Sequence, residues 1–289
     1  MTTLLIGANG QLASELWQAF SDQELIPLSH ADLELTDRAQ VNETLQKYRP
    51  GLILNTAAYH RVDECEDEPE RAFAVNAIAV RDLALAAKEI GAALVHFSTD
   101  YVFDGRQQSP YREVDPPCPL SVYAMSKLAG EHFVRTILER HFVIRTCGLY
   151  AGPGSRAKGG NFVEAMLALA REGREIRVVG DQVLTPTSAK DLAKKVRQLA
   201  ETGQYGLYHI TNSGECSWYQ FAAAIFDLAG MRPRLKEITS AAYGARARRP
   251  AYSVLDNASL RSLGLDDLRG WQDALADYLD ERSRTQVRT

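Results

Sequence analysis

The chain has 289 residues, of which 33 are lysine or arginine and 37 are aspartate or glutamate, so its formal net charge is −4. With 45% hydrophobic and 24% charged residues it has the composition of an ordinary globular protein. Its length suits one large domain, or one domain with a smaller lobe. This balance does not indicate nucleic-acid or membrane binding, although local basic clusters can still hold a phosphate. The sequence also lacks a run of the roughly 20 apolar residues that a membrane helix needs.

The first residues are not expected to form an export signal. No basic segment precedes the apolar run that ends at Ile6, and glycine and polar residues follow directly. The cysteines are far apart and form no zinc-ligand pattern; they are Cys65, Cys118, Cys147 and Cys216. We therefore expect a cytoplasmic protein with reduced thiols and no metal site, and the sequence leaves a requirement for Mg²⁺ open.

Short apolar runs alternate with helical patterns over the first 150 residues. Strands are expected at 3–6, 25–28, 52–54, 93–97 and 142–145. Helices are expected at 11–20, 41–48, 69–90 and 123–140. Continuous apolar strands separated by helices predict a parallel sheet covered on both faces. Right-handed crossovers then make this a doubly wound α/β fold.

The regular alternation ends near residue 150, where a glycine-rich loop follows at 152–160. Beyond it we expect helices at 162–172, 188–202 and 217–229, and strands at 176–179 and 207–210. This half is expected to complete the sheet and to build a smaller lobe. The tail 283–289 shows no apolar pattern and is expected to be disordered.

The turn after the first strand has the pattern of a phosphate-binding loop. Gly7 permits a tight turn, and Gly10 lets the backbone approach a pyrophosphate at the positive end of the following helix. Ala13 stands where a third glycine often lies. Since the motif follows a strand and opens a helix, it predicts dinucleotide binding.

The end of the second strand bears on the choice between NAD and NADP. An acidic residue there would bind the ribose hydroxyls and repel a 2′-phosphate. Leu28 is followed by Ser29 and His30, and acidic residues return only at Asp32 and Glu34. This favours NADPH or tolerance of both cofactors, with Asp32 reaching the ribose as the alternative.

Tyr123 and Lys127 lie four residues apart on a predicted helix, which places them on one face. An ammonium near a phenol is expected to lower the tyrosine pKa, so that the phenol can exchange a proton with a substrate oxygen near neutral pH. Thr99 follows the fourth strand, at the sheet edge where ligands of open α/β sheets bind, and could bond the same oxygen.

These strings resemble the extended short-chain dehydrogenase/reductases. The resemblance is carried by Gly7-x-x-Gly10, Asn55-Thr-Ala-Ala58, Ser98-Thr-Asp-Tyr-Val-Phe-Asp-Gly105 and Tyr123-x-x-x-Lys127. Within that superfamily the chain is most similar to the dTDP-4-dehydrorhamnose reductase family. Further matches cover nearly the whole chain, among them Val62-Asp63, Gly130-Glu131, Ile144-Arg145-Thr146, Asn161-Phe162, Asp181-Gln182, Pro186-Thr187 and Arg248-Arg249-Pro250.

The resemblance implies a Rossmann-type doubly wound parallel sheet with a smaller C-terminal substrate-binding lobe. Residues 1–150 would form the NAD(P)-binding domain, and 151–289 would complete the sheet and bind a sugar nucleotide, in interleaved segments. The implied reaction is NADPH-dependent reduction of a nucleotide-linked 4-keto-6-deoxyhexose, with dTDP-4-dehydrorhamnose becoming dTDP-rhamnose. NADH is the alternative cofactor, and a homodimer is compatible with the resemblance.

The resemblance also implies roles for individual residues. Tyr123 would donate the proton, Lys127 would be its electrostatic partner, and Thr99 would bond the substrate. The cofactor would contact Gly7, Gly10, Gln11, Leu12, Ser29, Glu34, Leu35, Ala58, Tyr59, His60, Tyr123 and Lys127. The substrate would contact Thr99, Asp100, Tyr123, Gly148, Asn161 and Arg249.

Some positions depart from the family pattern. The family usually has a tryptophan against the sugar after Arg-Thr-Ser, whereas this chain reads Arg145-Thr-Cys-Gly148. Losing an aromatic face removes packing surface, so we expect a wider sugar pocket or a different substrate. Ser29 stands where the family often has aspartate, which supports NADPH, and His60 stands where it often has threonine.

Two other functions fit the same motifs. An epimerase or dehydratase of the superfamily would recycle a tightly held cofactor and consume no NADPH. A non-catalytic regulatory subunit that binds NADP is a further alternative, against which the complete Thr99, Tyr123 and Lys127 set argues.

Several remaining residues have structural and functional interpretations. Asn76, among apolar helix residues, is expected to support the active site without taking part in chemistry. The arginines at 246, 248 and 249 form either a diphosphate clamp or a solvated basic loop. Trp17, Trp218 and Trp271 are expected to pack in the core or the lobe.

Overall fold

The computed structural model describes residues 2–152 and 160–286. Its centre is a six-stranded parallel sheet in the order β10-β5-β4-β3-β1-β2. The strands are β1 (Thr3–Ile6), β2 (Leu25–Leu28), β3 (Leu52–Asn55), β4 (Ala93–Thr99), β5 (His141–Thr146) and β10 (Gly206–His209). After β2 the chain crosses to the other side of β1, so the strand order reverses between β1 and β3. Ligands of open α/β sheets bind at the carboxyl ends of strands beside such a reversal.

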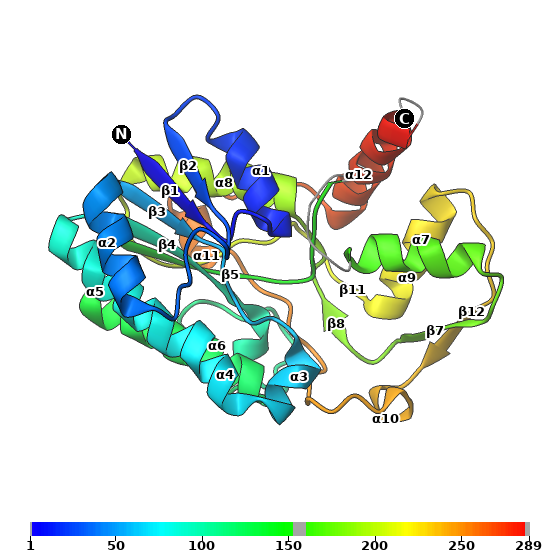
Figure 1. The fold of residues 1–289 in the computed structure, drawn as a ribbon. Coiled ribbons are helices and arrows are strands. Elements are labelled where there is room, and N and C mark those ends of the chain that lie inside the picture. Colours follow the sequence, from blue (N-terminus) through cyan, green and yellow to red (C-terminus); the bar gives the residue numbers. More distant parts are fainter. Residues whose placement is uncertain (1, 153–159, 287–289) are drawn as a thin grey trace.

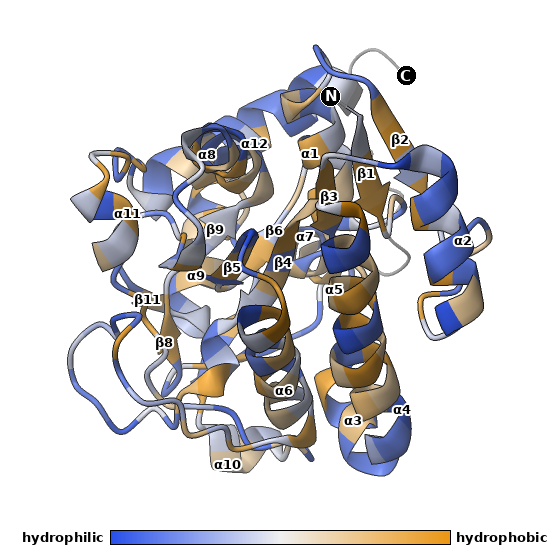
Figure 2. Ribbon diagram, turned by 90° about the vertical axis from the view of Figure 1, so that its left-hand side faces the viewer, coloured by the Kyte–Doolittle hydropathy of each residue, from blue (hydrophilic) through white to orange (hydrophobic). Residues whose placement is uncertain are grey.

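Helices cover both faces of the sheet, as the apolar strands predict (Figure 1). One face carries α2 (Arg38–Tyr48), α5 (Ala79–Ile90) and α6 (Val122–Ile137). The other carries α1 (Gln11–Ala19), α8 (Ala189–Thr202) and α11 (Ala258–Ser262). Successive strand residues point to opposite faces: Leu4 packs in the first layer and Leu5 in the second. Figure 2 shows β1 and β3 as apolar strands between helices with polar outer surfaces.

A smaller lobe packs beside the sheet (Figure 1). Its core joins α7 (Phe162–Arg171), α9 (Trp218–Leu228), α12 (Trp271–Gln286) and the parallel pair β7 (Ile176–Val179) and β12 (Leu235–Ile238). Phe162 and Phe221 stack there with ring centroids 5.6 Å apart. Short strand pairs connect the lobe to the sheet: β6 (Leu149–Tyr150) with β9 (Thr187–Ser188), and β8 (Val183–Leu184) with β11 (Cys216–Ser217). The remaining lobe helix is α10 (Ser240–Tyr243).

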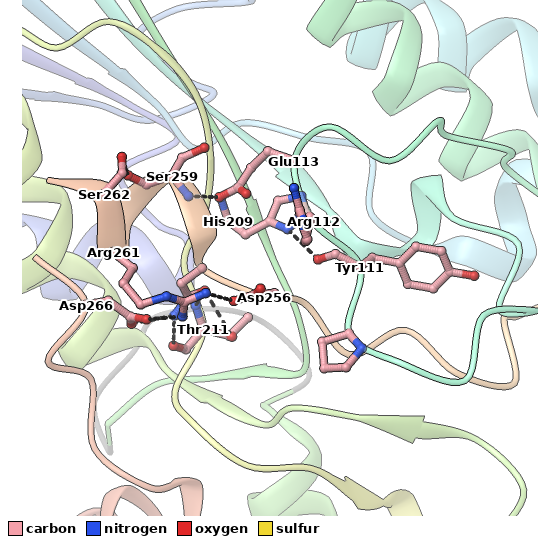
Figure 3. Close-up of polar contacts among 12 residues, drawn as sticks. Tyr111, Arg112, Glu113, His209, Thr211, Asp256, Ser259, Arg261, Ser262 and Asp266 are labelled. Carbon is pink, nitrogen blue, oxygen red and sulfur yellow. Dashed lines mark hydrogen bonds and ion pairs between the residues drawn. The ribbon is translucent and has the colours of Figure 1, made fainter. Parts of the chain in front are cut away.

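The chain passes repeatedly between the sheet and the lobe. Helix α8, strand β10 and helix α11 belong to the sheet layers although all three follow residue 150. A polar network fastens this second half to the segment after β4 (Figure 3). Glu113 accepts hydrogen bonds from the backbone N–H groups of His209 and Ser259, both at 3.0 Å. Tyr111 and Leu255 form a backbone bridge beside it.

Two local expectations are wrong. The single helix expected at 69–90 is divided into α4 (Pro69–Phe73), a π-helical segment at Ala74–Ile78, and α5, and it follows the short helix α3 (Val62–Asp67). The tail expected to be disordered continues α12 as far as Gln286, while residues 287–289 lie outside the described part. Most of the glycine-rich loop, residues 153–159, lies outside it as well.

In the described part of the chain, every helix is too short or too polar to cross a membrane.

Candidate functional site

A cavity of about 390 Å³ lies at the carboxyl ends of the central strands, where the sheet meets the lobe. Ten of the predicted site residues line it: Gly10, Gln11, Leu12, Ala58, His60, Thr99, Asp100, Tyr123, Lys127 and Gly148. These residues come from α1, from the segment after β3, from the end of β4, from α6 and from the segment after β5. The structure thus brings the predicted cofactor turn and the predicted catalytic residues to one cavity.

The first turn has the geometry that a bound phosphate requires. Gly7 has a φ of +82°, and a Cβ there would lie 2.7 Å from Thr56 Oγ1 and 2.9 Å from the Ala57 nitrogen. Only glycine fits that approach. Gly10 is the N-cap of α1 and, as a glycine, has no side chain that could cap the helix. The first N–H groups of α1 therefore lie free of intrahelical partners at the positive end of the helix.

The predicted catalytic pair, Tyr123 and Lys127, lies on the first two turns of α6. Ser121 begins the helix by accepting a hydrogen bond from the Ala124 N–H at 3.3 Å. Lys127 is only 3% exposed, and its Nζ donates to the Phe97 carbonyl of β4 at 2.6 Å. The hydrogen bond to β4 fixes the ammonium next to the end of the strand that carries Thr99.

The electrostatics of the pair differ from the expectation. Burial, together with the negative charge of Asp100, raises the pKa of Tyr123 above its ordinary value. Burial lowers the pKa of Lys127 to about 8. The expected lowering of the tyrosine pKa is therefore wrong for the free protein, because burial and the negative charge of Asp100 both disfavour the phenolate. The consequence is a phenol that keeps its proton and can donate it.

Asp100 organises the side chains around Tyr123. It is 4% exposed, and its carboxylate accepts from Thr99 Oγ1 at 2.9 Å and from Cys147 Sγ at 3.1 Å. Ser253 is a third donor to it. The Thr99 hydroxyl also accepts the Tyr101 N–H at 3.1 Å and reaches the Tyr123 hydroxyl. Since the Thr99 proton is committed to Asp100, Thr99 is placed to orient the phenol.

Asn76 supports this arrangement from the π-helical segment, as the sequence predicts. It is fully buried, and its Oδ1 accepts from the Tyr59 N–H at 2.8 Å. Its Nδ2 donates to the Tyr59 carbonyl and to Ser126 Oγ, both at 3.0 Å. Gly130 of α6 lies so close that a Cβ would approach the Asn76 carbonyl oxygen to 2.3 Å. Asn76 thereby ties the segment after β3 to the catalytic helix.

Three buried oxygens at the cavity have no hydrogen-bond partner among the described residues: Gln11 Oε1, Ser98 Oγ and Thr146 Oγ1. Buried polar groups are normally satisfied, so such oxygens indicate a ligand. Together with the open first turn of α1, they fit a dinucleotide that extends from Gly10 toward Lys127.

Other predicted cofactor residues do not line the cavity. Ser29 donates its hydroxyl to Asp32 at 2.6 Å, and Glu34 accepts from the Thr36 hydroxyl at 2.7 Å. Leu35 is 5% exposed and packs under α2 and α5. Tyr59 directs its hydroxyl toward Glu64 and Glu68, at 3.1 and 3.0 Å.

Two predicted substrate residues serve other contacts. Asn161 caps α7 by accepting from the Glu164 N–H at 3.1 Å, and its amide donates to the Ala151 carbonyl at 2.9 Å. Arg249 forms a bidentate ion pair with Asp63, with nitrogen–oxygen distances of 2.9 and 3.1 Å. The neighbouring Arg246 pairs with Asp67. A phosphate at this loop would have to compete with these carboxylates.

Sequence reasoning missed the lobe side of the cavity. Val183, Leu184 and Trp218 line it together with Pro250 and Ser253. Trp218 packs against the lobe core, as expected, and its half-buried indole also lines the cavity. The same expectation is wrong for Trp17, which is 47% exposed. No local pattern distinguishes the residues on the lobe side from ordinary core positions, because only the pairing of β8 with β11 brings them to the site.

The described residues include no cluster of three or more histidine, cysteine, aspartate or glutamate side chains that could hold a metal ion.

The family model of the RmlD substrate binding domain matches residues 1–284 of the chain. The chain is 41% identical over 286 residues to the spore coat polysaccharide biosynthesis protein SpsK of Bacillus subtilis, covering 98% of this chain and 99% of that protein. It is 37% identical to dTDP-4-dehydrorhamnose reductase of Escherichia coli, over 97% of this chain and 98% of that one. A crystal structure of dTDP-4-dehydrorhamnose reductase from Bacillus anthracis in complex with NADP is 38% identical, with a TM-score of 0.93. That likeness covers 97% of this chain and 99% of the other.

Proposed function

Because the chain belongs to the RmlD substrate-binding-domain family and is an NAD(P)-dependent oxidoreductase, we propose that it reduces dTDP-4-dehydrorhamnose to dTDP-rhamnose with NADPH. The observation that carries the proposal is the meeting of the phosphate turn with Thr99, Tyr123 and Lys127 in one cavity. The relatives named dTDP-4-dehydrorhamnose reductase support the choice of substrate. SpsK, named for spore coat polysaccharide, is consistent with a sugar nucleotide and leaves the identity of the sugar to experiment.

The chain's own residues account for the proton chemistry. When bound, NADPH supplies the hydride for the C4 carbonyl. Tyr123 donates its proton to the C4 oxygen, and its raised pKa keeps that proton available in the free protein. The Lys127 ammonium stabilises the phenolate that is left, and Thr99, held by Asp100, orients the phenol. The oxygen thus becomes a hydroxyl as the carbonyl carbon is reduced.

The cofactor would lie along the cavity from the α1 turn to α6. Gly7 and Gly10 would let the backbone approach the pyrophosphate, with Gln11 and Leu12 beside it. Lys127 would hold the nicotinamide ribose, and the unpartnered hydroxyls of Ser98 and Thr146 would bond the cofactor's inner end. The NADP bound to the Bacillus anthracis relative supports NADPH as the preferred cofactor.

The adenosine side keeps NADH as the alternative cofactor. Asp32 accepts the Ser29 N–H and hydroxyl, so a carboxylate is held at the end of β2, where it would favour the ribose hydroxyls over a 2′-phosphate. Glu34 and Leu35 would contact the adenosine through the backbone near the same strand end. Ala58, Tyr59 and His60 would contact the cofactor from the segment after β3.

The substrate would lie between the lobe and the end of β4. Thr99, Asp100 and Gly148 line the cavity there. Arg249 would bind the diphosphate only by giving up part of its ion pair with Asp63, whose pKa that guanidinium lowers. Asn161 would act indirectly, by positioning α7.

The deciding experiment follows NADPH absorbance with dTDP-4-dehydrorhamnose, generated in place from dTDP-glucose by the preceding dehydratase and epimerase reactions. We expect stoichiometric NADPH oxidation and a dTDP-rhamnose product identified by mass and chromatography. Absence of NADPH oxidation with any nucleotide 4-keto sugar would overturn the proposal. Product formation without net NADPH loss would favour an epimerase or dehydratase instead. Co-purification with a partner enzyme and no turnover would favour a regulatory subunit.

A further inference from the structure

The space beside Gly148 is filled by a residue of the lobe. Gly148 has a φ of +52°, and a Cβ built on it would lie 2.7 Å from Leu184 Cδ1 and 3.1 Å from the Pro186 Cα. A side chain at 148 therefore has no room while Leu184 is present. Leu184 thus occupies the space beside Gly148 that a larger residue at this position would take.

Leu184 and the neighbouring Trp218 reach the cavity from the lobe. Leu184 lies on β8 and pairs with Cys216 of β11, two residues before Trp218 opens α9. Leu184 is 3% exposed and belongs to an apolar cluster with Cys147, against which Trp218 packs. On its other side the Trp218 ring lies 4.7 Å from the Phe162 ring, between centroids. The indole is thus held in place by the lobe while part of it lines the cavity.

Polar and apolar residues line different parts of the cavity. Thr99, Asp100 and Tyr123 gather at the end of β4 and on α6, while Val183, Leu184 and Trp218 offer carbon surface on the lobe side, next to the polar Gln182. A sugar held with its keto group at Tyr123 must place another part of the ring against this apolar surface. Aromatic and branched side chains commonly supply such contact surface in small-molecule sites.

We propose that Leu184 and Trp218 form the apolar wall that positions the sugar of the substrate, in place of any side chain at position 148. Leu184 acts by filling the space beside Gly148, and Trp218 acts by presenting its ring. Both are specificity-determining residues for the reduction, and neither touches the transferred proton. This inference rests on the proposed function, because it assigns the sugar end of the same cavity.

The test compares binding of dTDP-L-rhamnose with binding of dTDP, which lacks the sugar, by calorimetry. For Leu184→Ala we expect about tenfold weaker binding of dTDP-L-rhamnose, since a lost apolar contact of this size in a pocket changes affinity by that order. The affinity for dTDP is expected to stay the same. In turnover, KM for the sugar nucleotide is expected to rise with little change in kcat. Trp218→Ala should act in the same direction.

Leu255→Ala is the matched control, since Leu255 belongs to the same apolar cluster, is 5% exposed and does not line the cavity. Leu255→Ala should lose about as much stability as Leu184→Ala. Its ratio of the affinities for dTDP-L-rhamnose and dTDP should stay that of the wild type. NADPH binding shows that each variant is folded. A more conservative variant, Leu184→Val, serves if Leu184→Ala does not fold.

The outcomes separate this inference from the proposed function. Suppose that the wild type reduces the 4-keto sugar, but that the ratio of the affinities for dTDP-L-rhamnose and dTDP is the same in Leu184→Ala, Trp218→Ala and wild type. This result would contradict the apolar wall and leave the proposed function supported. If both nucleotides weaken equally in these variants but not in Leu255→Ala, the residues act on the nucleotide and the wall is again overturned. If the wild type binds no sugar nucleotide, both proposals fail.

Discussion

Tyr123 shows how burial, acting on a single residue, suits the site to one direction of proton transfer. Its raised pKa keeps the phenol neutral in the free protein, and a reduction needs a neutral donor. Lys127, four residues later, is held against β4 through the Phe97 carbonyl. A buried ammonium with a lowered pKa is sensitive to small changes in its surroundings. We therefore expect substitutions of these two residues to have clear effects on turnover and on its pH dependence.

Tyr123→Phe removes the proton donor without removing ring volume. We expect turnover to fall by roughly 10²- to 10⁴-fold, the usual contribution of general acid catalysis. NADPH should still bind, because the backbone turn at Gly10 is untouched. Stopped-flow turnover and a separate fluorescence titration with NADPH measure the two effects. Turnover equal to wild type would remove Tyr123 from the mechanism.

Loss of the Lys127 charge is expected to set the alkaline limb of the pH profile of kcat/KM. The pKa of Lys127 in the free protein is about 8, below the ordinary lysine value because of burial. The positive charge is therefore present below pH 8 and is lost as the pH rises through that value. We expect kcat/KM for NADPH, which reports the free protein, to fall above about pH 8.

Lys127→Arg keeps its charge through this range, so any residual activity of this variant should lack the alkaline limb. A wild-type profile that stays flat to pH 10 would contradict the assignment.

At the scale of elements, the helix after β3 is interrupted where it meets the catalytic helix. The π-helical segment Ala74–Ile78 sets Asn76 against Tyr59 and Ser126. Insertions of this kind often mark functional sites. Here the insertion lets one amide hold both the cofactor-side segment and α6.

Asn76→Ala should disrupt both contacts. The Tyr59 N–H and carbonyl would lose their buried partner, which costs about 1–3 kcal/mol of unfolding free energy. Turnover should also fall, because Ser126 lies between Tyr123 and Lys127 on α6. Urea denaturation and NADPH oxidation measure the two effects. Asn42→Ala, on the outer helix α2, is the control and should change neither by much. Wild-type stability for Asn76→Ala would show that these hydrogen bonds contribute nothing.

At the scale of the whole molecule, a series of buried polar contacts joins α6 to the second half of the chain. Glu131 of α6 and Arg145 of β5 form a bidentate pair with nitrogen–oxygen distances of 2.9 and 2.7 Å. The Arg145 guanidinium lies 3.4 Å from His209 of β10, whose pKa burial lowers to about 3. The Tyr111 carbonyl faces the other ring nitrogen of His209 at 3.0 Å. A neutral His209 can contact the cation without repelling it.

Breaking this pair should be costly, because both charges are almost completely buried. Removing one partner, as in Glu131→Gln or Arg145→Met, is expected to lower the unfolding free energy by about 3–5 kcal/mol. The double variant Glu131→Leu with Arg145→Met should lose less than the sum of the single changes. Chemical denaturation measures each.

The exposed pair Arg232–Asp227 is the control for the buried one. Asp227→Asn should change stability by less than about 1 kcal/mol. Additive losses at Glu131 and Arg145 would show that the two buried charges do not depend on each other.

Much of this protein follows from its sequence alone. Apolar runs such as Leu52–Asn55 can be satisfied only between two helical layers, so the parallel sheet is predictable. The meeting of Gly10, Thr99, Tyr123 and Lys127 at one cavity was also predictable, since their placement depends on local spacing at strand ends. The residues on the lobe side of the cavity could not be predicted in this way. Leu184 and Trp218 look like ordinary core residues, and only the pairing of short strands far apart in the chain turns them toward the cavity. The direction of the Tyr123 pKa shift could not be predicted either, because burial of the phenol and its closeness to Asp100 depend on the surrounding tertiary structure.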